Sequence, residues 1–181
     1  MYKPDKIVVI DLEATCWGDD EIPIGSSVDI LEIGICNLVV ATGEITDKQS
    51  IYVIPERSEI TPFCTELTGI THDLISEKGI PFAEACKIVR EQYEPEQRLW
   101  AGYGAFDRIQ MEKQCRDLQV PFPMGNSYLN IMPLFCAKMK LTGMRGLKRA
   151  LRTINEPFDG LHHNGADDAY NAAKVLRYIL K

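Results

Sequence analysis

The sequence has no pair of cysteines at the spacing of a zinc or redox motif. Its six cysteines lie 20 or more residues apart, and a chain of 181 residues can bury a core without disulfides. It also has no apolar run long enough to cross a membrane and no signal-peptide core. We therefore expect a single domain over residues 1–181, reduced thiols, a cytoplasmic location and no membrane partner.

Acidic residues are missing from one long stretch. Between Leu118 and Asn155 there is no Asp or Glu, so the stretch carries +6 and the rest of the chain −12, within a net charge of −6. A negative net charge argues against a nucleic-acid partner, but a locally basic strip can follow a phosphate backbone. The charges alone fit a solvated helix face equally well. The basic residues of this stretch are Lys138, Lys140, Arg145, Lys148, Arg149 and Arg152.

No Gly-x-x-x-x-Gly-Lys-Ser/Thr motif occurs, which excludes a P-loop nucleotide triphosphatase. An apolar strand that ends in acids can be the Walker B element of such an enzyme, and here an apolar run, residues 7–10, leads directly into Asp11 and Glu13. The missing motif rules that interpretation out. The run predicts a strand buried on both faces, and side chains two residues apart point to the same side of a strand. Two such carboxylates repel each other unless a cation lies between them, and oxygen ligands suit Mg²⁺ or Mn²⁺. Taken alone, the pair is more often a solvated acidic end of a strand.

The remaining pattern predicts an α/β domain with a mixed sheet, because an antiparallel hairpin is followed by alternating helices and strands. Thr61 and Pro62 indicate a helix start, and Gly69 a helix end. The expected strands are residues 7–13, 28–40, 47–54, 98–103 and 128–132. The expected helices are residues 62–68, 71–76, 81–93, 105–118, 133–139, 145–154 and 166–180.

Two further places carry chemistry-bearing residues. Asp107 stands at a strand-to-helix junction, where open α/β sheets bind ligands, although an acid there also stabilises a helix N-terminus. The second is the polar turn Leu161-His162-His163-Asn164-Gly165-Ala166-Asp167-Asp168 before the last helix. Taken one by one, its acids are better explained as helix-start residues and its histidines as surface residues.

The order of these residues resembles a known enzyme family. Asp11-x-Glu13, Asp107 and His163-x-x-x-x-Asp168 match the pattern of the DEDDh subgroup of the DnaQ-like 3′–5′ exonuclease superfamily. The blocks at residues 11–17, 30–34, 63–71 and 161–171 are similar to the branch of three-prime histone mRNA exonucleases and KapD-like bacterial exonucleases. The resemblance implies a ribonuclease H-like mixed five-stranded sheet flanked by helices.

The resemblance also implies a mechanism. Asp11, Glu13, Asp107 and Asp168 would hold two divalent metal ions, Mg²⁺ or Mn²⁺, and His163 would act as general base. His162 has the same offset to Asp167, but the family has Asn three residues after its catalytic Asp, as Asn171 follows Asp168. The reaction would release nucleoside 5′-monophosphates from a 3′ end.

The implied substrate is single-stranded or 3′-overhanging nucleic acid, with RNA preferred. By resemblance Ala14 and Thr15 lie beside the terminal ribose, and Phe63, Leu67 and Phe106 contact the last base. Many relatives have Trp where this chain has Phe106. Two alternatives stay open: the same chemistry on single-stranded DNA or short oligonucleotides, and a non-catalytic RNA-binding module on the same fold.

Overall fold

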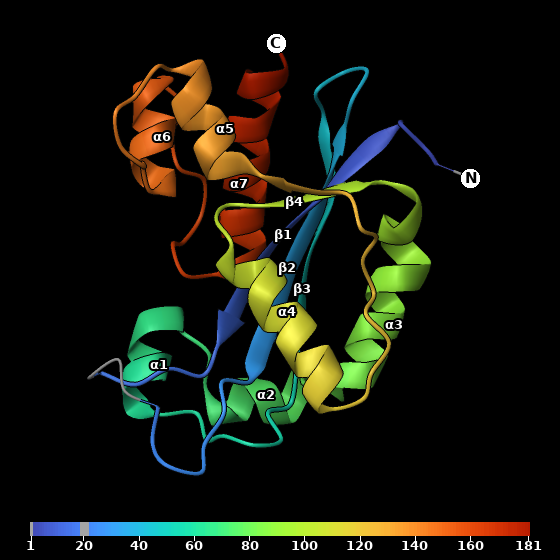
Figure 1. Ribbon diagram of the computed structural model, residues 1–181. Helices are drawn as coiled ribbons and strands as arrows, with labels where there is room; N and C mark the ends of the chain where they lie inside the picture. The colour runs from blue at the N-terminus through green and yellow to red at the C-terminus, as the bar shows by residue number, and fades with distance from the viewer. Residues whose placement is uncertain (1, 19–21) are drawn as a thin grey trace.

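The computed structural model describes residues 2–18 and 22–181 and contains a five-stranded mixed sheet in the order β3-β2-β1-β4-β5 (Figure 1). The central strand β1 pairs with β2 in antiparallel fashion and with β4 in parallel fashion. β3 extends the hairpin, and β5 runs parallel to β4. The strands are β1 (Lys6–Ala14), β2 (Ile30–Val39), β3 (Ile45–Tyr52), β4 (Leu99–Gly102) and β5 (Tyr128–Asn130).

Helices cover both faces of this sheet. Helices α3 and α4 pack on one face, and α5, α6 and α7 on the other, whereas α1 and α2 lie at the end where β1 finishes (Figure 1). The helices are α1 (Pro62–Thr68), α2 (His72–Lys78), α3 (Phe82–Tyr93), α4 (Phe106–Asp117), α5 (Ile131–Lys138), α6 (Leu147–Thr153) and α7 (Gly165–Leu180), with a 3-10 turn η1 (Pro95–Gln97) before β4. Within the described residues, no helix is both long and apolar enough to span a membrane.

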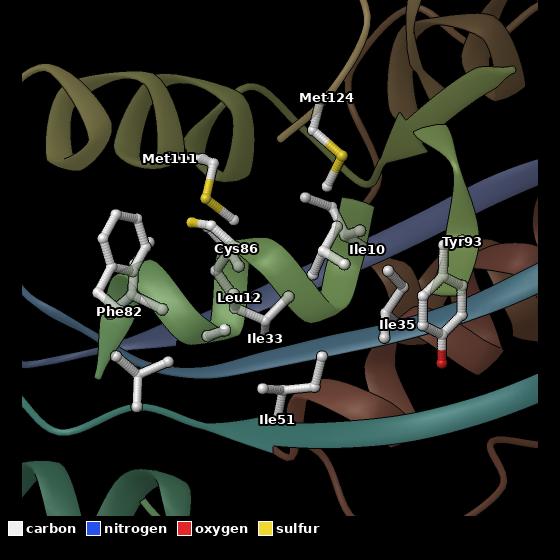
Figure 2. Packing of buried hydrophobic residues seen from close by; sticks show 14 of the residues in the cluster. Ile10, Leu12, Ile33, Ile35, Ile51, Phe82, Cys86, Tyr93, Met111 and Met124 are labelled. Atoms are coloured by element: carbon white, nitrogen blue, oxygen red, sulfur yellow. The ribbon is translucent and has the colours of Figure 1, made fainter. Parts of the chain in front are cut away.

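The alternation of side chains along β1 decides which face carries the acids. Val8, Ile10 and Leu12 point into the core under α3 and α4, part of which Figure 2 shows. Ile7 and Val9 point into the core under α5, α6 and α7. Asp11 and Glu13 continue the second series, so both carboxylates lie on the α7 side of the sheet.

The predicted elements are present, with some ends displaced. Thr61 caps α1, Pro62 is its first residue and Gly69 ends it in the left-handed region, as predicted. The third strand was predicted over residues 47–54, whereas β3 covers Ile45–Tyr52, because its pairing with β2 begins where Ile45 lies opposite Leu38.

The boundary between β5 and α5 was wrong in the prediction. The strand ends at Asn130, which caps α5, so Met132 is helical and Pro133 lies in the first turn rather than at the helix start. Pro is tolerated there because the first N–H groups of a helix have no partner within the helix.

Candidate active site

The end of β1 brings the first two predicted acids together with one from the last helix. Ligand atoms of Asp11, Glu13 and Asp168 all lie within 4.8 Å of one another. Asp168 lies in the first turn of α7 and is 3% exposed, and Glu13 is 7% exposed. These three carboxylates, of which Asp11 is partly buried and the other two are buried, form a compact oxygen-ligand cluster.

A contact between two glycines lets α7 approach the sheet. Gly34 on β2 pairs with Asp11, and a Cβ at Gly34 would lie 1.8 Å from the backbone carbon of Gly165. No side chain fits in that space, so only glycine at position 34 allows the first turn of α7 to pack here. The close approach places Asp168 beside β1.

Glu32 binds the N-terminal end of α7. It lies opposite Glu13 in the β1–β2 pair and is fully buried. Its carboxylate accepts hydrogen bonds from the backbone N–H groups of Gly165 and Ala166 at 3.0 and 3.2 Å and from the hydroxyl of Ser50 at 2.6 Å. A carboxylate at a helix N-terminus satisfies N–H groups that have no partner within the helix. Glu32 was not predicted as a site residue, although an acid within an otherwise apolar strand was the signal for it.

Asp107, at the start of α4, lies beside β1 but is not among the carboxylates whose ligand atoms all lie within 4.8 Å of one another. It is 5% exposed, and its Oδ1 accepts a hydrogen bond of 3.0 Å from the backbone N–H of Leu12, the residue between Asp11 and Glu13. A Cβ on Gly102, at the end of β4, would lie 2.7 Å from its other oxygen. The short β4 and its glycine therefore leave room for Asp107 beside β1.

The negative charges of Asp11, Glu13 and Asp107 are not balanced by a basic side chain of the described residues. Burial, reinforced by Asp107 and Asp168, raises the pKa of Asp11 well above its ordinary value. Burial and the charge of Asp168 raise the pKa of Glu13 to about 8, and burial raises that of Asp107 to about 6 despite the hydrogen bond from Leu12. Among the described residues no Lys or Arg forms an ion pair with these three acids. An all-oxygen donor set with unbalanced negative charge fits a hard divalent cation.

Both candidate histidines lie beside Asp168. The backbone N–H of His163 donates to Asp168 Oδ2 at 2.8 Å, and His162 Nδ1 lies 2.9 Å from Asp168 Oδ1. The two imidazole rings stack with centroids 4.0 Å apart. His163 has a φ of 62°, which is uncommon for a non-glycine residue. Burial, together with the charges of His162 and Lys148, lowers the pKa of His163, so its ring is neutral near pH 7.

The segment that carries the histidines is tied to α7. Lys174, 3% exposed, donates to the carbonyl of Pro157 and pairs with Asp159 at 2.8 Å. Asn171 donates to the carbonyl of Asp159 at 2.8 Å and accepts from its N–H at 3.1 Å. Two polar side chains of one helix therefore hold the turn that leads to His163.

Beside the carboxylates lies a pocket of about 380 Å³. Of the predicted substrate contacts, Ala14, Thr15, Leu67 and Phe106 line it, whereas Phe63 is not among its lining residues and is 40% exposed. The Thr15 hydroxyl accepts a hydrogen bond from the N–H of Asp29, which holds the wall of the pocket in place. The pocket is also lined by residues that were not predicted as substrate contacts: Leu12, Cys16, Trp17, Ile22 and Val28.

Comparison with known proteins points to one family of enzymes. A family model described as exonuclease, RNase_T, matches residues 8–176. ERI1 exoribonuclease 2 of Mus musculus is 29% identical over 202 residues, which cover 97% of this chain and 28% of that protein. The 3′-5′ exoribonuclease 1 of Mus musculus is 30% identical over 194 residues, which cover 98% of this chain and 53% of that protein. The chain thus spans about half or less of these relatives.

Solved structures agree with the sequence relatives. The nuclease domain of 3′hExo, described as a DEDDh family member bound to rAMP, has a TM-score of 0.86 at 26% identity, covering 98% of this chain and 92% of that one. A 3′-exonuclease structure described by its recognition of a histone mRNA stem-loop has a TM-score of 0.85 at 25% identity, covering 99% and 64%. Exonuclease I shares the fold at a TM-score of 0.71. The predicted ribonuclease H-like α/β fold is confirmed.

Proposed function

This chain belongs to the RNase_T exonuclease family, as its DEDDh-like residues predicted, and we propose that it is a metal-dependent 3′–5′ exoribonuclease. The observation that carries the proposal is the cluster of Asp11, Glu13 and Asp168, with His163 bonded through its backbone to Asp168. Mutually repelling acids beside a neutral histidine suit hydrolysis of a phosphodiester better than a binding-only role.

Asp11, Glu13 and Asp168 are the residues that would hold divalent metal ions, with Asp107 completing the set. When bound, a pair of such ions offsets the charges of the acids and the scissile phosphate and stabilises the oxygens that attack and leave. The preference for oxygen ligands favours Mg²⁺ or Mn²⁺. Asp107 also holds the strand itself through its bond to Leu12.

His163 is the proposed general base. Its lowered pKa keeps one ring nitrogen free to take a proton from the attacking water at neutral pH. The ties from Lys174 and Asn171 to the preceding turn, together with the bond from its own N–H to Asp168, fix where the ring lies. Hydrolysis on the upstream side of the terminal nucleotide releases a nucleoside 5′-monophosphate.

The pocket beside the acids is the proposed site of the 3′-terminal nucleotide. Leu67 and Phe106 are 39% and 53% exposed at its edge, so apolar surface is available for a base. Stacking of this kind tolerates every base, so we expect little sequence preference. RNA is the proposed substrate because the relatives are named exoribonucleases and one related structure holds rAMP.

A gel assay on 5′-labelled single-stranded RNA and on the DNA of the same sequence tests the proposal. With Mg²⁺ or Mn²⁺ we expect a ladder that shortens from the 3′ end, faster on RNA, and no shortening in EDTA. The variant Glu13→Gln should be inactive, whereas Glu84→Gln, at an exposed acid on α3, is the matched control and should match wild type. Faster cleavage of DNA would overturn the substrate, and no cleavage of either by the folded protein would favour a binding module.

A further inference from the structure

The basic residues of the chain fall into two groups when their ion pairs are compared. Outside the stretch between Leu118 and Asn155, every Lys and Arg except Lys78 and Lys181 pairs with a carboxylate. Inside that stretch, none of the six has an acidic partner among residues 2–18 and 22–181. As far as the structure describes the chain, cations without acidic partners are thus concentrated in the stretch that has no acids.

Two of the six are already used by the fold. The ammonium group of Lys138 donates to the carbonyls of Tyr178 and Ile179 at 2.9 and 2.8 Å, where it satisfies the C-terminal end of α7. The guanidinium of Arg145 donates to the carbonyls of Gly143 and Met144. Of the six basic residues, four therefore have side chains that are not bonded to backbone carbonyls of the described residues, and three of these four lie on α6.

Three of the others share the outer face of α6. Leu147, Ala150 and Leu151 are buried in the core between α6 and α7. At 3.6 residues per turn, Lys148, Arg149 and Arg152 fall within an arc of about 100° on the opposite side, and all three are exposed. We call these three residues the α6 strip.

The α6 strip begins beside the proposed active site. The ammonium group of Lys148 lies 5.5 Å from the centroid of the Phe158 ring, and that ring meets the ring of His162 edge-on at 5.6 Å. His162 in turn stacks on His163. Figure 1 shows α6 beside the upper half of α7, joined to the start of α7 by the segment that carries the histidines.

Like charges on one helix face repel each other, and a bound polyanion would offset that repulsion. The chain is acidic overall, and its active site is a cluster of acids, so a polyanion needs a local cationic surface to approach. A strand whose last phosphodiester lies at His163 and that runs toward α6 would bring its upstream phosphates next to Lys148.

We propose that the α6 strip binds the upstream phosphates of single-stranded RNA, so that this chain prefers substrates long enough to reach α6. The inference rests on the proposed function, since it takes the 3′ end to lie at the carboxylate cluster. Beyond that function, the α6 strip would make the rate of hydrolysis depend on the length of the substrate and on the salt concentration.

The double variant Arg149→Gln/Arg152→Gln tests the proposal and leaves Lys148, which touches Phe158, in place. Lys78→Gln/Lys181→Gln is the matched control, because it removes the same charge from two other cations without partners in the described part of the chain. We expect kcat/KM on a 16-nucleotide RNA to fall about tenfold in the strip variant, and at least tenfold more than on a dinucleotide. The slope of log kcat/KM against log salt should become shallower by about 1.4, or about 0.7 for each phosphate that the protein no longer neutralises.

Equilibrium binding of the labelled 16-mer in EDTA separates this inference from the proposed function. If wild type binds the RNA through the α6 strip but cleaves nothing, the proposed function fails and the strip stands. If wild type cleaves both lengths, and the strip variant loses no more on the 16-mer than the control does or keeps the wild-type salt slope, the strip fails. Tighter binding to anionic lipid vesicles than to RNA, lost in the strip variant, would assign the surface to a membrane and overturn the inference.

Discussion

Metal-free protein should lose stability as the pH rises, because Glu13 is protonated in the folded state where it is ionised in the unfolded one. Its pKa is about 8 in the fold against an ordinary 4.5, and the side chain is 7% exposed. Between these values the folded state binds more protons than the unfolded state, so the free energy of unfolding falls with increasing pH. Carboxylates with a lowered pKa, such as Asp5 at about 2, complete their titration below this window.

The size of the effect follows from the shift. Linkage through Glu13 alone removes at most about 3 kcal/mol between pH 5.5 and pH 8. For a domain of this size, that corresponds to a fall in Tm of about 6–12 °C. The raised pKa of Asp11 acts in the same direction. Metal ions that hold the ionised acids should reverse the loss, by about 2.7 kcal/mol at a concentration one hundred times Kd.

Thermal unfolding in EDTA from pH 5.5 to pH 8, repeated with Mg²⁺, measures both effects. Glu13→Gln should flatten the profile and abolish most of the stabilisation by Mg²⁺, whereas the control Glu84→Gln should follow wild type. A constant Tm of the metal-free wild type over this range, or a fall in the Tm of Glu13→Gln as steep as that of wild type, would contradict the raised pKa of Glu13.

Three other variants test separate parts of the site. His163→Ala should lower kcat by a factor of about 10²–10⁴ and keep the stabilisation by Mg²⁺; a larger loss from His162→Ala would make His162 the base. Gly34→Ala should cost more than about 3 kcal/mol, or prevent folding, because its Cβ meets the backbone of Gly165, and a wild-type urea midpoint would contradict the packing. Lys174→Met should cost about 1–3 kcal/mol and lower kcat more than it raises KM, because it frees the turn before His163, and equal changes in both would argue against that role.

Sequence reasoning located the acids of β1 because their geometry is local. Alternation along one strand is enough to place Asp11 and Glu13 on the same face. The proximity of Asp168 was expected only through the resemblance to a known family, because no pattern in one chain reports which helix end meets which strand. Their roles as metal ligands stay predictions.

Features that depend on register were out of reach. Glu32 was conspicuous as an acid in an apolar strand, but a strand buried on both faces shows no alternation, so the sequence did not report that Glu32 would lie opposite Glu13 and bond to the start of α7. The charge of the basic stretch was evident from the sequence. The hydrogen bonds from Lys138 to the carbonyls at the end of α7 depend on the packing of α5 beside α7, which the sequence does not report.

The contact between Gly34 and the start of α7 has a consequence for the chain during its synthesis. Asp11 and Glu13 are made long before Asp168 and the helix that presents it. A nascent chain can form the β1–β2 hairpin long before the third carboxylate exists. The carboxylate cluster is therefore incomplete until the first turn of α7 has been made and has packed against Gly34.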